Sequence, residues 1–188
     1  LAMEAATEAT RSGLAVVMGE CTPLEAGGSS GLHAAPLQAL RPLLLAVADR
    51  CRERGAQETL RLLGPQGRVL VAYEPSLEKL PGLLELPEPA PLPGPAARAR
   101  LLSALRHTLL APAEAQPLLL VLDDLQWVDE LSLELLRRPQ PEDLASRGLL
   151  LLGTYRLEEL DATLRQFVRA PGAEDLVLAG TEGGLGLG

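Results

Sequence analysis

The sequence has few aromatic residues and almost no lysine. Its aromatic side chains are Trp127, Tyr73, Tyr155 and Phe167, which leaves Leu, Val and Ala to build the core. The 17 basic residues are Lys79 and 16 arginines spread along the chain, against 25 acidic residues and a net charge of −8. Proteins that bind nucleic acid directly gather basic residues in a patch and offer aromatic rings to the bases. Direct contact with nucleic acid is therefore not expected.

Cysteine and histidine are also scarce. Cys21 and Cys51 form no CxxC pair, and His33 and His107 lie far apart in the sequence, so a metal site built from them is not expected. No apolar run reaches the roughly 18 residues that span a bilayer, and Leu1–Thr10 lacks the basic start of a signal peptide. A cytoplasmic location without membrane contact is the default expectation, and a disulfide is not expected in that reducing compartment.

Hydrophobic periodicity and turn signals divide the chain into alternating helices and strands. Apolar residues make up 47% and charged residues 22% of the chain, as in a globular domain. The pattern predicts helices over 1–12, 35–54, 57–63, 96–110, 129–138 and 157–170, and strands over 14–19, 118–123, 149–156 and 175–180. Continuous aliphatic strands between helices predict an α/β fold, a mostly parallel sheet with helices on both faces.

Glycine and proline mark the boundaries of several predicted elements. Gly13 is expected to end the first helix, and Pro42 to break or kink the second. Prolines recur over 81–95, which predicts a semi-extended connector on the surface rather than a core element. The glycine-rich tail 181–188 is expected to be flexible.

Two of the predicted strands end on polar residues. The run "LLLVLDD" ends at Asp123 and Asp124, and "LLLLGTYR" ends at Thr154 and Arg156. Ligands of parallel sheets bind beyond the carboxyl ends of the strands. Several aliphatic residues followed by two acids form the Walker B pattern, in which the first carboxylate holds Mg²⁺ near nucleotide phosphates and the second orients or deprotonates water.

The longer string "LLLVLDDLQWVDELSLELL", followed by "RGLLLLGTYRLEEL", resembles the STAND class of AAA-like P-loop ATPases, the regulatory ATPase domains of multidomain signalling proteins. The resemblance implies that Asp123 coordinates Mg²⁺ through a water molecule. It also implies that Asp124 polarises the attacking water and that Arg156 reads the γ-phosphate as a sensor 1 arginine.

ATP and Mg²⁺ are the implied cofactors, and the implied partners are a nucleotide and other domains of the parent protein, such as a kinase, cyclase or DNA-binding output domain. Trp127 and Asp129 fit the same string, and we expect structural roles for both: an indole packed under the loop and a helix cap.

The phosphate-binding loop GxxxxGK[ST] is not found in this sequence. In the family that the chain resembles, this loop precedes the helix leading into "RSGLAVV". The expectation is therefore a single incomplete P-loop NTPase-like domain over 1–188 that starts just after Walker A. Its function would be that of an ATP-binding and hydrolysing regulatory core whose nucleotide state acts as a switch. The alternative is a degenerate NTPase fold that serves as a non-catalytic protein-interaction module.

Two further patterns are weaker. Gly27, Ser29 and Gly31 satisfy the GxSxG motif of α/β hydrolases, with His107 as a possible base, but a loop separates the preceding strand from Gly27. Asp123 and Thr154 at neighbouring strand ends are also typical of phosphoacceptor receiver domains. The acidic pair and the lysine that a receiver needs at other strand ends are not convincingly present.

Overall fold

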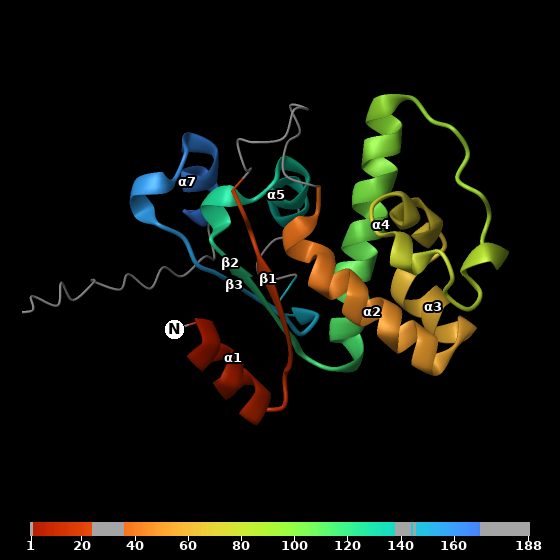
Figure 1. Cartoon of the computed structure of the whole chain (residues 1–188), viewed down its shortest axis with the longest axis horizontal. Helices are drawn as coiled ribbons and strands as arrows, with labels where there is room; N and C mark the ends of the chain where they lie inside the picture. The colour runs from red at the N-terminus through yellow and green to blue at the C-terminus, as the bar shows by residue number, and fades with distance from the viewer. Residues whose placement is uncertain (1, 24–35, 138–143, 145, 170–188) are drawn as a thin grey trace, which may run out of the picture.

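The computed structural model describes residues 2–23, 36–137, 144 and 146–169 of the chain (Figure 1). At the centre of this part is a parallel sheet in the order β1-β2-β3, formed by β1 (Ala15–Glu20), β2 (Leu118–Asp123) and β3 (Leu149–Gly153). Glu20 lies opposite Asp123, and Leu122 lies opposite Gly153, so the three strands end at the same edge. The predicted α/β fold with a parallel sheet is confirmed.

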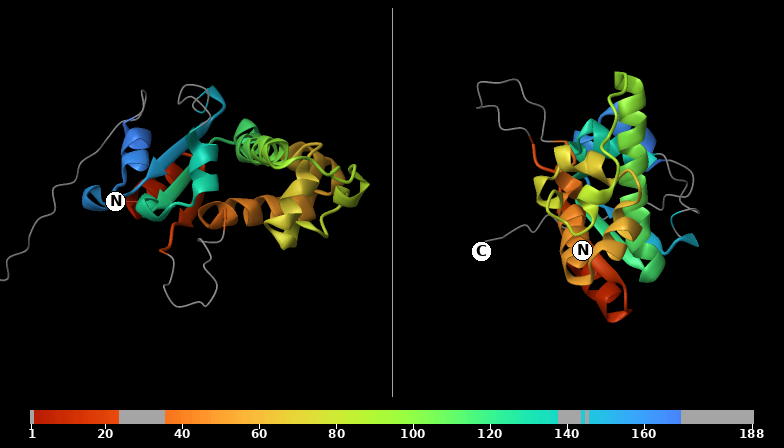
Figure 2. Two further views of the ribbon diagram at one scale, coloured as in Figure 1. Left: turned by 90° about the horizontal axis from the view of Figure 1, so that it is seen from above. Right: turned by 90° about the vertical axis from the view of Figure 1, so that its right-hand side faces the viewer.

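Helices surround the sheet in two groups. In Figures 1 and 2, α2, α3 and α4 lie together on one side of the strands and α1 lies on the other. The α-helices are α1 (Ala2–Arg11), α2 (Arg41–Arg54), α3 (Ala56–Leu63), α4 (Gly94–Ala115), α5 (Glu130–Arg137) and α7 (Ala162–Val168). The 3-10 helices are η1 (Gln38–Leu40), η2 (Gly67–Ala72), η3 (Pro75–Leu77), η4 (Leu83–Glu85), η5 (Leu125–Trp127) and η6 (Leu157–Glu159).

The core is aliphatic, as the shortage of aromatic residues predicts. The five apolar residues of β2 from Leu118 to Leu122 are all buried, with no more than 7% of any of them exposed. Leucines of α2, α3 and α4 join Leu118, Leu120 and Leu122 in one continuous hydrophobic cluster. Because both faces of the central strand are buried, every residue of it removes apolar surface from water. This explains why the sequence of β2 is continuously apolar and does not alternate with polar residues.

The helix boundaries at Gly13 and Pro42 follow from backbone chemistry. Gly13 adopts a φ of 84°, and the amide of Leu14 donates to the carbonyl of Ala9 (3.0 Å), which closes the end of α1 as predicted. Pro42 lies in the first turn of α2, where its missing N–H costs no helical hydrogen bond. The predicted helix over 35–54 is therefore broken, with η1 before Pro42 and α2 from Arg41 onward.

The proline-containing segments over 81–95 and around Pro112 are packed into the fold more closely than predicted. Leu83, in η4, is fully buried in the core, so the connector over 81–95 is not a purely surface element. Helix α4 starts at Gly94 and continues past the predicted end at Leu110, with Pro112 inside it. Pro112 has no N–H for the carbonyl of Thr108, and packing of the buried Leu109, Ala111 and Ala113 holds the helix together at this point.

The segment after β2 also departs from the prediction in its details. The strand predicted over 149–156 ends at Gly153, and the single helix predicted over 157–170 is wrong. Asp161 caps α7 by accepting a hydrogen bond from the amide of Leu164 (2.6 Å), so a new helix starts there and η6 stands alone before it. The predicted strand over 175–180 and the tail 181–188 lie outside the described residues.

Candidate functional site

The site is built on two carboxylates at the end of β2. Asp123 is the last residue of the strand, and Asp124 follows it in the left-handed backbone conformation (φ 57°, ψ 48°). Non-glycine residues rarely adopt this conformation, and those that do cluster at functional sites. The turn at Asp124 ends the strand and starts η5, so the two adjacent carboxylates leave the backbone in different directions.

Thr154 joins both aspartates to the end of β3. Its hydroxyl donates to Oδ1 of Asp123 and accepts a hydrogen bond from the backbone amide of Asp124 (3.1 Å). The carbonyl of Thr154 also accepts from the amide of Leu125 (2.8 Å). The sequence placed Thr154 at a strand end but assigned it a role only in the receiver alternative. The structure makes it the residue that fixes the position of both acids.

Gln126 is a site residue that the sequence analysis missed. Its Nε2 donates to Oδ1 of Asp124 (2.8 Å), and its Oε1 accepts from the backbone amide of Arg156 (3.2 Å). It therefore connects the two strand ends a second time. Periodicity along the sequence could not reveal this role of Gln126, because Arg156 lies 30 residues away, in the connection between β3 and η6.

Arg156 reaches the same edge of the sheet through its backbone, whereas its side chain turns elsewhere. The guanidinium Nη1 lies 3.1 Å from Oε1 of Glu159, and 62% of the arginine side chain is exposed. Asp123, Asp124 and Arg156, the three residues chosen from the sequence, thus belong to connected segments. The described structure brings the acids together with Thr154 and Gln126, and pairs the arginine with Glu159.

Asp129 caps α5, as predicted, and also makes a long-range contact. Its carboxylate accepts from the amide of Ser132 (2.9 Å), from the hydroxyl of Ser132 (2.6 Å) and from the amide of Leu37 (3.1 Å). Leu37 has a φ of 67° and starts η1. The carboxylate therefore holds the segment before α2 against the start of α5, next to the end of β1.

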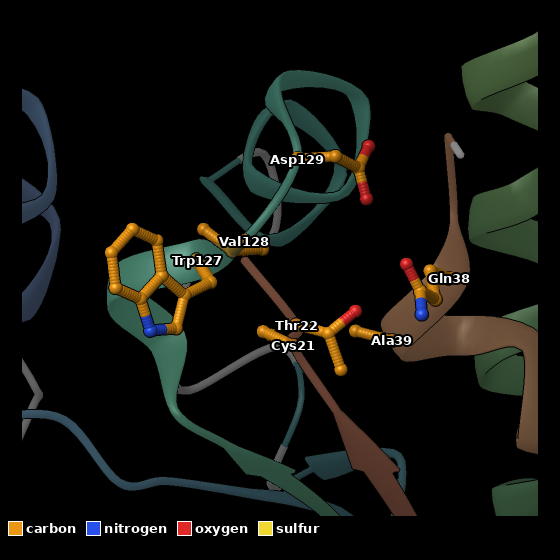
Figure 3. Close-up of a pocket in the computed structure, with 7 residues that line it drawn as sticks. All are labelled: Cys21, Thr22, Gln38, Ala39, Trp127, Val128 and Asp129. Atoms are coloured by element: carbon orange, nitrogen blue, oxygen red, sulfur yellow. The ribbon is translucent and has the colours of Figure 1, made fainter. Parts of the chain in front are cut away.

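The indole of Trp127 is 42% exposed, so the predicted packing under the loop is wrong. Figure 3 shows it pointing away from Asp129 and Gln38, at the rim of a small open pocket. The pocket lies between the ends of β1, η5 and η1, and its lining residues are Cys21, Thr22, Gln38, Ala39, Trp127, Val128 and Asp129. A Cβ on Gly19 would collide with the carbonyl of Ala39, so only glycine lets η1 approach β1 this closely.

Cys21 forms the floor of this region and is 3% exposed. Burial, and after it the negative charges of Asp129, Asp124, Asp123 and Glu20, together raise the pKa of its thiol to about 12. The thiol is therefore protonated at neutral pH and is not a nucleophile. Burial also raises the pKa of Cys51.

The described residues lend no support to the GxSxG pattern. Ser29 lies outside them, and Nε2 of His107 is 2.9 Å from the carbonyl of Arg61, in the contact between α3 and α4. Within the described ranges, no group of three or more His, Cys, Asp or Glu side chains is arranged to hold a metal ion. No helix in that part of the chain has the length and apolar character needed to cross a membrane.

Comparison with known proteins adds one finding. A sequence-family model described as an AAA ATPase domain matches residues 1–152, which include β1, β2 and both carboxylates. No curated protein and no solved structure gives a significant match.

Proposed function

Because the chain belongs to the AAA ATPase domain family, we propose that it forms the ATP-binding and hydrolysing core of a multidomain signalling regulator of the STAND class, in which the nucleotide state acts as a switch. The observation that carries the proposal is the pair of aspartates at the end of β2. The hydroxyl of Thr154 donates to the carboxylate of Asp123 and accepts from the backbone amide of Asp124. Such a pair beside a neighbouring strand end is the arrangement that a Walker B site requires.

The residues present fit a nucleotide-bound Mg²⁺. This ion takes one or two carboxylates from the protein, together with phosphate oxygens and waters, so it needs no larger protein cage. Asp123 would hold the ion, which supplies charge neutralisation at the phosphates when it is bound. The Thr154 hydroxyl orients the Asp123 carboxylate by donating to its Oδ1.

Asp124 would act as the residue that polarises the attacking water. Its Oδ1 accepts from Gln126, while its own amide is held by Thr154, so the carboxylate has a defined orientation. A positioned carboxylate that accepts a proton from water contributes about 10²-fold to 10⁴-fold to a rate. Arg156 would read the γ-phosphate, which requires its guanidinium to leave Glu159.

The test is ATP hydrolysis by the full-length protein. Asp124→Asn keeps the size of the side chain and removes its basicity, so we expect turnover to fall about 100-fold or more while nucleotide binding is spared. Asp123→Asn is expected to weaken the dependence of hydrolysis on Mg²⁺ concentration. Turnover equal to that of the wild type in both variants would remove the roles proposed for these acids.

A non-catalytic interaction module with a degenerate NTPase fold is the second candidate. It is favoured by one observation, the lack of GxxxxGK[ST] in this sequence. The same experiment separates the two candidates, since the full-length wild-type protein hydrolyses ATP under the first and does not under the second.

A further inference from the structure

Gln126 contacts two groups that have opposite hydrogen-bonding character. The carboxylate of Asp124 only accepts hydrogen bonds, and the backbone amide of Arg156 only donates one. The side-chain amide of Gln126 satisfies both with its NH₂ on Asp124 and its oxygen toward Arg156. The opposite flip of the amide would place oxygen against carboxylate and NH₂ against N–H, so only one orientation fits.

This contact limits what Asp124 can do. The backbone of Asp124 is held in the left-handed region with its amide on Thr154, and Gln126 then holds Oδ1 of the carboxylate. With one oxygen engaged and the backbone tethered, the carboxylate is restrained from rotating between alternative rotamers. A group that must accept a proton in a transition state gains rate from such restraint, because the ordering is complete before the reaction.

The same amide connects the acid to the segment that carries Arg156. The amide of Arg156 belongs to the connection between β3 and η6, and Gln126 is the residue that bonds it to η5. A shift of the Arg156 backbone toward a phosphate would therefore change its hydrogen bond to Gln126. Through Gln126, it would also change the orientation of the Asp124 carboxylate.

We infer that Gln126 is a positioning residue for ATP hydrolysis, which orients the carboxylate of Asp124 and couples it to the backbone of Arg156. The inference rests on the proposed function and adds to it the residue that aligns the water-polarising acid. Gln126 acts through Asp124 and does not itself contact the reacting atoms, so it is not a catalytic residue.

The test uses Gln126→Glu in the full-length protein, because this change preserves the shape of the side chain while it removes the donor and adds a negative charge. The variant places a carboxylate against Asp124, and kcat should fall roughly tenfold, the usual effect of losing one charge-assisted hydrogen bond in a transition state. KM for ATP should stay within about twofold, since the amide does not hold the nucleotide. Gln126→Met, which removes both hydrogen bonds without adding charge, should lower kcat in the same way.

Gln126→His provides the rescue, because a neutral imidazole has one donor and one acceptor nitrogen. It should recover most of the wild-type kcat. Gln57→Glu, the same change at an exposed position of α3, is the matched control and should leave kcat unchanged. Thermal unfolding of each variant shows that it is folded.

The outcomes separate this inference from the proposed function. A wild-type kcat in both Gln126→Glu and Gln126→Met, with hydrolysis by the wild type intact, overturns the role of Gln126 and leaves the ATPase proposal standing. A His variant as slow as the Glu variant, or kcat and KM changing together, also overturns it, because a general structural role would act that way. A wild-type protein that does not hydrolyse ATP overturns the proposed function and this inference with it.

Discussion

Asp124 and Cys21 show how the end of β2 changes the behaviour of single residues. Asp124 occupies a backbone conformation that is costly for a side chain with a Cβ, and its hydrogen bonds to Thr154 and Gln126 offset that cost. Cys21 lies close to the same acids, and its buried thiol is surrounded by negative charge. Burial, and after it the charge of these acids, therefore keeps this thiol neutral at neutral pH.

The raised pKa of Cys21 predicts a loss of stability at high pH. The thiol has an ordinary pKa of 9.0 when unfolded and a pKa of about 12 in the folded chain. Between these values the unfolded state loses a proton that the folded state keeps, so the free energy of unfolding falls as the pH rises. One thiol lowers the free energy of unfolding by up to about 1.4 kcal/mol for each pH unit in this range. The stabilisation that it provides is fully present below the pKa of the unfolded state.

Urea unfolding between about pH 8 and about pH 10.5 measures this slope. Cys51 shifts in the same direction, so the double variant Cys21→Ala/Cys51→Ala is the baseline and should show a flatter dependence. An identical slope in the wild type and the double variant would show that neither thiol has the expected pKa.

At the scale of elements, an ion-pair network connects three helices beside the sheet. Glu58 of α3 pairs with Arg50 of α2 (2.7 Å) and with Arg61 (2.8 Å), and Nη1 of Arg61 donates to the carbonyl of Ala111 in α4 (2.9 Å). The Glu58 side chain is 12% exposed, so its charge is held largely by these two arginines. The carbonyl of Ala111 lies in the last turns of α4, close to the point where Pro112 interrupts its hydrogen bonding.

Glu58→Gln is expected to lower the free energy of unfolding by about 1–3 kcal/mol at neutral pH, because it removes the negative charge that accepts three hydrogen bonds from Arg50 and Arg61. The hydrogen bond from Arg61 lowers the pKa of Glu58 to about 2, against an ordinary value of 4.5. The stabilisation is thus present above the unfolded pKa and is lost as the pH falls toward about 2. Chemical denaturation at several pH values tests this.

Glu53→Gln, the same change at an exposed position of α2, is the control and should alter stability by less than about 0.5 kcal/mol. A loss in Glu58→Gln that stayed constant down to acid pH would show that packing, rather than the charge of Glu58, is responsible.

At the scale of the whole molecule, the parallel sheet collects residues that are distant in sequence at a single edge. The ends of β1, β2 and β3 supply Glu20, the two aspartates and Thr154 to this edge. The layer of α2, α3 and α4 lies to one side of it (Figure 2) and contributes a large share of the hydrophobic cluster. The candidate site therefore lies at the strand ends, and the helical layer packs beside them.

The 188-residue chain on its own is expected to bind Mg·ATP weakly. The backbone amides and lysine of a phosphate-binding loop supply most of the affinity for the phosphates, and GxxxxGK[ST] is not in this sequence. Isothermal titration is the primary measurement, and the emission of Trp127, the one tryptophan, at the edge of the site gives a second signal. A micromolar dissociation constant for the chain alone would contradict the prediction.

The sequence by itself determined the elements whose signals are local. The aliphatic run before Asp123 and the glycine after α1 predicted β2 and the end of α1, because burial of a strand and the conformational freedom of glycine act on adjacent residues. The same local pattern selected Asp123 and Asp124 as candidate site residues. Their roles in hydrolysis stay predictions.

Only the tertiary structure decided how the site is assembled. The bonds from Thr154 to Asp123 and from Arg156 to Gln126 join residues 31 and 30 positions apart, so no periodicity along the chain could reveal them. The buried position of Leu83 and the continuation of α4 through Pro112 were missed for the same reason, since packing overrode the local preference of proline-rich sequence. Contacts between strand ends form only when the sheet is in register, and that register is a property of the folded chain.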